Sequence, residues 1–222
     1  MSAPSVMRYA VLGTGVVGRA IGGKLVSLGQ ETMMGSRTAR NDNAAAWVGE
    51  AGSLASAGTF RDAAAFGQVI VNATTGAASL EALAAAGADN LAGKTLIDVA
   101  NPLDFSQGMP PTLSVCNDDS LAEQIQRAFP DTHVVKSLNT MNCDVMVDPG
   151  LLSGSHTVFV CGNDTRAKEQ VVGLLTSFGW PAEDILDLGD LAAARGTEMY
   201  LPLWLRLWGA TGTGHVNIKV AT

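Results

Sequence analysis

The feature that most constrains this chain is a glycine-rich segment, Gly13-Thr-Gly-Val-Val-Gly18, which directly follows a short apolar run. A GxGxxG pattern in this position joins a strand to a helix. Gly13 permits the tight turn, Gly15 lets the backbone approach a pyrophosphate, and Gly18 allows the helix to pack closely on the strand. The helix N-terminus then offers free N–H groups to phosphate oxygens. The motif predicts a dinucleotide site, and a glycine-rich turn without a ligand is the alternative.

Short apolar runs alternate with segments of helical composition along the rest of the chain. Strands are expected at residues 8–13, 32–35, 68–73, 94–99, 133–136, 157–161 and 185–188. Helices are expected at residues 17–28, 43–57, 77–86, 121–129, 164–178 and 191–208. Continuous Val, Ile and Leu strands that alternate with helices are typical of a parallel sheet covered on both faces. The pattern predicts a Rossmann-type, doubly wound α/β fold.

Two regions of the expected fold stand apart from the repeating units. Residues 101–119 form the longest irregular stretch, and a loop of this length in a compact domain is more often functional than idle. Residues 1–160 are expected to form the dinucleotide-binding Rossmann core. Residues 161–222 are expected to form a short, mostly helical C-terminal extension that completes the acceptor site and the dimer interface, without being an independent domain.

Composition excludes several classes of protein. The 222 residues carry a net charge of −7 and only 14 Lys and Arg, so no nucleic-acid partner is expected. Cys116, Cys143 and Cys161 lie far apart, which suits neither a disulfide framework nor a zinc site and favours a reducing cytoplasm. The apolar stretches fall short of the roughly 20 residues that cross a bilayer. We therefore expect a cytoplasmic protein with no metal and no membrane partner.

The end of the second expected strand indicates which dinucleotide is bound. NAD enzymes place Asp or Glu there to hold the ribose 2′-hydroxyl. This chain has Gly35-Ser-Arg-Thr-Ala-Arg40, in which Ser36 can donate a hydrogen bond and Arg37 can contact a 2′-phosphate. Arg40 or Asn41 can add a further contact. The segment favours NADP, and a solvated basic turn is the alternative.

The third, fourth and fifth strands are expected to end in the same crevice. Gly76 permits a close backbone approach, and Asn101 offers an amide to the ribose or the nicotinamide, with ordinary turn chemistry as the alternative for both. Lys136 is expected to face solvent or a phosphate rather than to act in catalysis. The sequence contains no HExxH or GxSxG motif and no carboxylate cluster, so no catalytic residue is assigned.

The segment at residues 199–208 is apolar nearly all round, and such a helix must be buried on most sides. We expect it to pack on the core and also on a second subunit or a flat aromatic ligand, with packing on the core alone as the alternative. Trp204 and Trp208 are one helical turn apart and share one face. The segment therefore predicts a homodimer.

The chain resembles the coenzyme F420-dependent NADP oxidoreductases over nearly its whole length. The resemblance rests on the Gly13 to Gly18 motif, on Gly35-Ser-Arg37, and on an ending with Leu201-Pro-Leu and Gly212-Thr-Gly-His-Val-Asn-Ile-Lys219. It implies that NADP(H) and coenzyme F420 bind and that the protein is a dimer. The implied cofactor contacts are Thr14, Gly15, Val16, Val17, Ser36, Arg37 and Asn41, with Gly76, Asn101, Cys143 and Val216 around the nicotinamide. Asn139, Met199 and Leu201 replace the histidine and hydroxyl residues of archaeal members.

The favoured function is hydride transfer between NADP(H) and F420 or a similar flat redox cofactor. Too little chain follows Val160 to enclose a small substrate, and transfer between stacked rings needs no acid–base residue. We expect the acceptor between residues 139–143, the final helix and residues 212–214. Two alternatives remain open: an NADPH-dependent flavin, quinone or ferric reductase, and a non-catalytic NADP-sensing protein.

Overall fold

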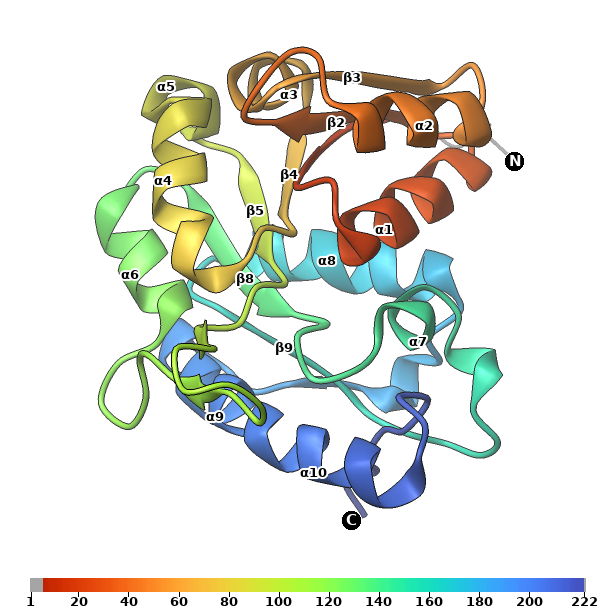
Figure 1. Ribbon diagram of the computed structural model, residues 1–222, viewed down its shortest axis with the longest axis vertical. Coiled ribbons are helices and arrows are strands. Elements are labelled where there is room, and N and C mark those ends of the chain that lie inside the picture. The colour runs from red at the N-terminus through yellow and green to blue at the C-terminus, as the bar shows by residue number, and fades with distance from the viewer. Residues whose placement is uncertain (1–5, 222) are drawn as a thin grey trace.

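The computed structural model describes residues 6–221 and contains one eight-stranded sheet with helices on both faces (Figure 1). The strand order is β10-β9-β8-β5-β4-β1-β2-β3. The strands are β1 (Arg8–Leu12), β2 (Glu31–Ser36), β3 (Ala55–Thr59), β4 (Val69–Asn72), β5 (Thr95–Asp98), β8 (His133–Ser137), β9 (Val158–Gly162) and β10 (Ile185–Asp187). The Rossmann-type α/β fold expected from the sequence is confirmed.

The helices cover the sheet in two layers, and a small hairpin projects from it. The helices are α1 (Val16–Ser27), α2 (Asp42–Ala51), α3 (Phe60–Phe66), α4 (Gly76–Ala86), α5 (Ala88–Leu91), α6 (Leu121–Ala128), α7 (Cys143–Val147), α8 (Thr165–Phe178), α9 (Ala194–Met199) and α10 (Leu201–Thr211). The hairpin consists of β6 (Leu103–Asp104) and β7 (Thr112–Leu113). None of the helices within residues 6–221 combines the length and the apolar character needed to span a bilayer.

Alternation of side chains along the strands builds a core on each face of the sheet. In β1, Tyr9 and Val11 belong to the cluster formed with α1, α7 and α8, while Ala10 and Leu12 belong to the cluster formed with α3, α4 and α6. This is the period of two that a strand imposes on its side chains. Strands buried on both faces are therefore apolar at consecutive positions, as the sequence indicated.

The prediction of a helix at residues 43–57 is wrong for the second half of this range. Helix α2 ends at Ala51, and Gly52 follows with a φ of +99°. The small residues of β3 then pair in parallel with β2, and Thr59 and Asp62 form a capping box that starts α3. Ala, Ser and Gly have weak strand propensity. The edge strand therefore depends on its pairing with β2, which the residues of β3 by themselves do not indicate.

The expectation of an entirely parallel sheet is also wrong at one edge. Strand β9 pairs antiparallel with β8, and β10 pairs parallel with β9. The connection at residues 138–157 stays at the carboxyl end of β8, so the chain returns along the sheet in the opposite direction. The Rossmann core was expected to end at residue 160, but this residue lies inside β9. The sheet therefore continues beyond the expected boundary and includes β10, which ends at Asp187.

The expected final helix at residues 191–208 is divided into a 3-10 turn, α9 and α10. Pro202 lacks an N–H group, and the helical hydrogen bonds are interrupted beside Tyr200. Within one chain the apolar segment is not buried on most sides, because Leu203 is 55% exposed and Trp208 is 44% exposed. Residues 215–221 form a C-terminal tail without regular secondary structure, and Thr157 N donates to Ile218 O at 2.8 Å.

A buried ionic cluster, Lys136 with Asp98 and Glu198, joins the centre of the sheet to the helices. Lys136 Nζ lies 2.8 Å from Asp98 Oδ2 and 2.8 Å from Glu198 Oε1, and all three side chains are buried. The Glu198 carboxylate also accepts hydrogen bonds from the first N–H groups of α6, at Leu121 and Ala122. The expectation that Lys136 faces solvent or a phosphate is therefore wrong.

Charge compensation governs the protonation of this cluster. Burial disfavours the charged form of Lys136, but the two carboxylates outweigh this effect and raise the pKa of Lys136 above its usual range. Burial raises the pKa of Glu198 in spite of the neighbouring ammonium group. The lysine thus remains charged, and it is the group that permits two acidic side chains to be buried together.

Replacing Lys136 with Met is expected to lower the free energy of unfolding by about 3–5 kcal/mol, because two buried carboxyl groups lose their cation. Since Glu198 already has a raised pKa, its carboxyl is expected to take up a proton in the folded variant. The folded variant then binds more protons than the unfolded chain, so its stability should rise as the pH falls from about 8 to about 5. Urea unfolding at both pH values measures the effect.

Arg127→Met is the matched control, because it breaks an ion pair with Asp119 in which the arginine side chain is 60% exposed. We expect this variant to lose much less stability than Lys136→Met, because solvent screens the exposed ion pair. An equally small loss for Lys136→Met would contradict the role given to the buried cluster.

Candidate functional site

Two adjoining cavities open at the carboxyl ends of β1, β4 and β5 and share a wall made of Ala73, Thr74 and Thr75. The first has a volume of about 540 Å³ and the second about 580 Å³. Both volumes lie within the range of small-molecule sites. The remaining residues that line the first cavity are Gly13, Thr14, Gly15, Ser36, Arg37, Asn41, Phe60, Ala78, Glu81, Ala82 and Ala85.

The glycine-rich turn forms the floor of the first cavity. Gly13 has a φ of +120°, and a Cβ atom there would lie 2.5 Å from Ala73 O, so the prediction of a tight turn is confirmed. A Cβ atom on Gly18 would lie 2.1 Å from Gly13 O, which confirms the predicted close packing of helix on strand. Gly15 has no neighbouring atom within 4 Å of its Cβ position, and no side chain caps α1. The N–H groups that begin α1 are thus free to bind an anion.

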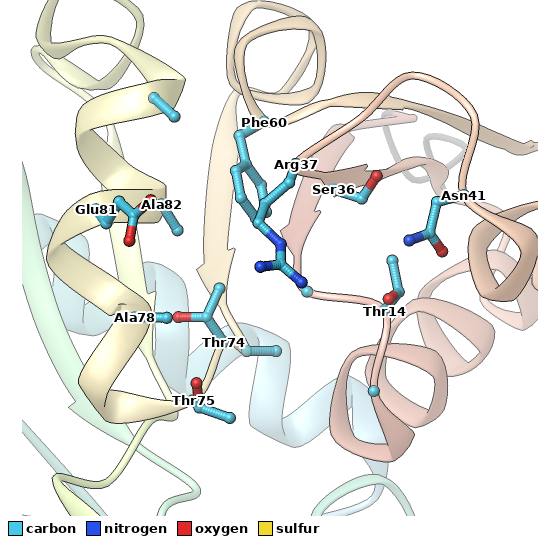
Figure 2. Close-up of a pocket in the computed structure, with 14 residues that line it drawn as sticks. Thr14, Ser36, Arg37, Asn41, Phe60, Thr74, Thr75, Ala78, Glu81 and Ala82 are labelled. Atoms are coloured by element: carbon cyan, nitrogen blue, oxygen red, sulfur yellow. The ribbon is translucent and has the colours of Figure 1, made fainter.

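Cationic and polar side chains follow the end of β2 at the opposite side of this cavity. Figure 2 shows the guanidinium group of Arg37 reaching into the cavity between Thr74 and Thr14. Asn41 Oδ1 accepts a hydrogen bond from Ala44 N and caps α2, which leaves its amide nitrogen directed toward the cavity (Figure 2). The Ser36 hydroxyl donates to Thr38 O at 2.5 Å. No carboxylate stands at the end of β2, and the acidic side chain in the lining of this cavity, Glu81, lies across it on α4 (Figure 2).

The shared wall is attached to the buried ionic cluster by a chain of hydrogen bonds. Asn72 Nδ2 donates to Asp98 Oδ1 at 2.8 Å. Asn72 Oδ1 accepts from the Thr74 hydroxyl at 2.7 Å. Sequence reasoning missed Asn72 and Asp98 as positioning residues, although each is a polar residue at the last position of an otherwise apolar strand. A polar residue at the end of such a strand thus indicates a buried side chain that holds the wall at residues 73–75 in place.

The second cavity is mainly apolar. The residues that line it beyond the shared wall are Val17, Gly76, Ala77, Val99, Ala100, Asn101, Leu103, Asp104, Phe105, Asn139, Met141, Met146 and Leu201. Asn139, Met141 and Leu201 lie where the acceptor was expected, whereas Met199, Gly212 and Gly214 are not among the lining residues. The loop at residues 101–119, which the sequence marked as functional without assigning a site, supplies Leu103, Asp104 and Phe105 instead.

Two residues of this cavity have structural tasks that the sequence did not indicate. Asn101 Nδ2 donates to Asn139 O at 2.8 Å, and Asn101 Oδ1 accepts from Asn139 Nδ2 at 2.9 Å. Each end of the Asn101 amide thus has one partner within the protein, and Asn101 still lines the second cavity, where it was predicted to contact the cofactor. A Cβ atom on Gly76 would lie 2.1 Å from Asn101 O. The glycine is required there by the Asn101 backbone, so its close approach is to protein rather than to a ligand.

Three expected cofactor contacts lie outside the lining of both cavities. Val16 and Cys143 line a neighbouring groove between α1, α2 and α7. Burial raises the pKa of the Cys143 thiol, which keeps it protonated. Val216 lies in the C-terminal tail, where its carbonyl accepts a hydrogen bond from Trp204 Nε1 at 3.2 Å. Within residues 6–221, no group of three or more His, Cys, Asp or Glu side chains is arranged to hold a metal ion.

Comparison with known proteins identifies the family. Residues 8–102 match the family described as NADP oxidoreductase, coenzyme F420-dependent. The crystal structure of a candidate F420-dependent NADP reductase from Arthrobacter sp. FB24 is 54% identical, with a TM-score of 0.92 over 97% of this chain and 100% of that chain. This agreement in sequence and fold extends over nearly the whole of this chain and the whole of the other.

Two curated relatives are more distant. The F420-dependent NADP reductase of Methanocaldococcus jannaschii is 28% identical over 130 residues, or 57% of each chain. The metalloreductase STEAP3 of Rattus norvegicus is 30% identical over 201 residues, which are 89% of this chain and 38% of the relative. The chain therefore spans well under half of the length of that metalloreductase. The match to the Arthrobacter protein, by contrast, covers 97% of this chain and all of that protein, and the chain belongs to the coenzyme F420-dependent NADP oxidoreductase family.

Proposed function

We propose that the first cavity binds the adenosine phosphate and diphosphate of NADPH, and that the second holds the nicotinamide with a flat redox acceptor such as coenzyme F420. The observation that carries the proposal is the wall shared by the two cavities at residues 73–75. A single extended dinucleotide can pass along this wall from Arg37 to the second cavity. Arg37 and Asn41 would hold the 2′-phosphate, and the N-terminus of α1 would hold the diphosphate.

The residues of the second cavity suit transfer between two rings. NADPH supplies a hydride, and the acceptor takes that hydride with one proton from solvent, which leaves NADP⁺ and the two-electron-reduced acceptor. The apolar side chains of Val17, Met141 and Leu201 would exclude water and hold the rings against one another. Orientation of the reacting atoms at roughly 3–3.5 Å supplies much of the acceleration in such transfers, without an acid–base residue.

A panel of electron acceptors tests this function. NADPH consumption is followed by absorbance with F420, FMN, FAD, a soluble quinone and a ferric chelate, each at equal concentration. We expect the highest kcat/KM with F420. Steady oxidation of NADPH with any ring acceptor contradicts a purely sensing role, and failure to oxidise NADPH with every compound contradicts the proposed function.

The similarity to STEAP3 favours ferric reduction as a second candidate function, because that relative is a metalloreductase. In this case a flavin would take the hydride in the second cavity and pass single electrons to iron. Reduction of the ferric chelate that requires added FMN or FAD, together with no reduction of F420, would favour this candidate over the first.

We further propose that the chain works as a homodimer in the cytoplasm, and that residues 161–222 complete the acceptor site and the interface. Met199, Leu203 and Trp208 are the exposed large apolar side chains of α9 and α10, and we assign them together to the interface as its apolar patch. Trp204 and Trp208 lie with ring centroids 5.7 Å apart, and Trp204 fixes this pair on the core. All three cysteines are free thiols, which suits a reducing compartment.

Arg37→Ala is expected to weaken NADPH binding by about 1.5–3 kcal/mol, because a charge-assisted hydrogen bond to the 2′-phosphate is lost. Affinity for NADH should change little, since NADH carries no such phosphate. Calorimetric titration with both dinucleotides measures the difference. Arg40→Ala is the control, because Arg40 does not line the cavity. Equal losses for NADPH and NADH in Arg37→Ala would refute the assignment of Arg37.

Leu203→Glu is expected to convert the dimer to a monomer, because it places a charge within the apolar patch. Light scattering at micromolar concentration measures the mass. Leu186→Glu is the control, since Leu186 is also exposed but lies on the edge strand β10 and away from the patch. A monomeric mass for the unaltered protein would exclude the dimer.

A further inference from the structure

The hairpin β6–β7 lies at the mouth of the second cavity, and its residues Leu103, Asp104 and Phe105 are part of the lining. Its strands pair at Leu103 with Leu113 and at Asp104 with Thr112. The Asp104 carboxylate accepts a hydrogen bond from Ser106 N at 2.8 Å, which turns the chain directly after β6. Phe105 lies between these two residues, so the hairpin sets the position of its backbone beside the cavity.

Phe105 differs from the other residues that surround this cavity. It is the aromatic side chain in the lining, whereas the remaining residues are aliphatic, small or polar. It is nevertheless 56% exposed, although burial of a phenylalanine side chain is strongly favourable. A large apolar ring held at a cavity mouth without burial of its own offers a flat face to a ligand in the cavity.

The depths of the cavity are apolar on the sides away from Phe105. Val17 comes from α1, Met141 from the segment after β8, and Leu201 from the start of α10. A flat ring that enters from the mouth would lie against these side chains at its inner edge and beneath Phe105 at its outer face. Pairs of aromatic rings adopt offset-stacked or edge-to-face arrangements, and such a pair is stabilised beyond the apolar area that it buries.

We propose that Phe105 is a specificity-determining residue that stacks on the ring of the acceptor and selects planar aromatic acceptors over compact ones. The inference rests on the proposed function, because it requires the second cavity to hold the acceptor. It assigns to the loop at residues 101–119 the recognition of the second substrate, and it leaves NADPH recognition to Arg37 and the glycine-rich turn.

The test compares Phe105→Ala, Phe105→Trp and Met109→Ala. Met109 lies on the same hairpin and is 68% exposed, but it does not line the cavity. Equilibrium binding of oxidised F420 and of FMN to the NADP⁺-loaded protein is measured by calorimetry, so that no turnover is needed. KM values for F420, FMN, NADPH and a ferric chelate are measured in parallel.

For Phe105→Ala we expect the Kd of both ring acceptors to rise about tenfold, equivalent to about 1.4 kcal/mol. NADPH affinity should remain within about twofold, and Phe105→Trp should restore ring binding because it keeps an aromatic face. The KM for the ferric chelate should not change, since a compact acceptor gains nothing from stacking.

The outcomes separate the inference from the function on which it rests. Unchanged Kd and KM for F420 in Phe105→Ala, while the unaltered protein reduces F420, would overturn the inference and leave the function standing. An equal loss in Met109→Ala would also overturn it, because the effect would then belong to hairpin stability. If the unaltered protein neither binds nor reduces any ring acceptor, both the function and the inference fail.

Discussion

The ion pairs of Lys136 with Asp98 and Glu198 are the interaction on which much of this architecture depends. They join two central strands, β5 and β8, to α9 and to the N-terminus of α6. Ions buried without partners are unstable, so the three groups must stay together for any one of them to be tolerated. Because Asn72 connects Asp98 to Thr74, the same cluster also fixes the wall between the two cavities.

The candidate site is built from parts of different rigidity. The glycine-rich turn and the shared wall are anchored in the sheet, and substitutions at Gly13 or Gly18 would bring a side chain into the backbone. These parts are suited to a ligand of constant shape, such as a dinucleotide. The hairpin that carries Phe105 and the end of α10 lie at the surface. Under the proposed function, variation in these surface segments would alter the acceptor or the subunit contact and leave the dinucleotide site unchanged.

The relatives of this chain include proteins whose names indicate different electron acceptors. The chain shares its fold and most of its length with the Arthrobacter protein, yet it also aligns with part of a mammalian metalloreductase. The family model ends at Pro102, immediately before the hairpin. The residues to which we assign phosphate binding thus lie within the matched region, whereas the hairpin side of the second cavity lies outside it.

Local patterns in the sequence were sufficient to predict features whose physical cause involves only residues that are close together in the chain. The glycine turn follows from the steric demands of adjacent residues, and Ser36 and Arg37 follow from their place at the end of β2. The alternation of strands and helices can also be recognised in the sequence, because strands buried on both faces consist of near-continuous apolar runs. These features were enough to predict the Rossmann-type fold, and they led to the dinucleotide site that we propose.

Other features depend on partners that are distant in the chain, and only the tertiary structure decided them. Strand β3 exists because β2 offers it a pairing edge, and β9 is reversed because its connection stays at one end of the sheet. Lys136 is buried because Asp98 and Glu198, which are 38 residues before it and 62 residues after it, converge on its ammonium group. Phe105 likewise reaches the second cavity through the hairpin. The sequence determined which residues bear charge, bulk or flexibility, whereas folding determined which of them meet, because such contacts depend on the packing of the whole chain.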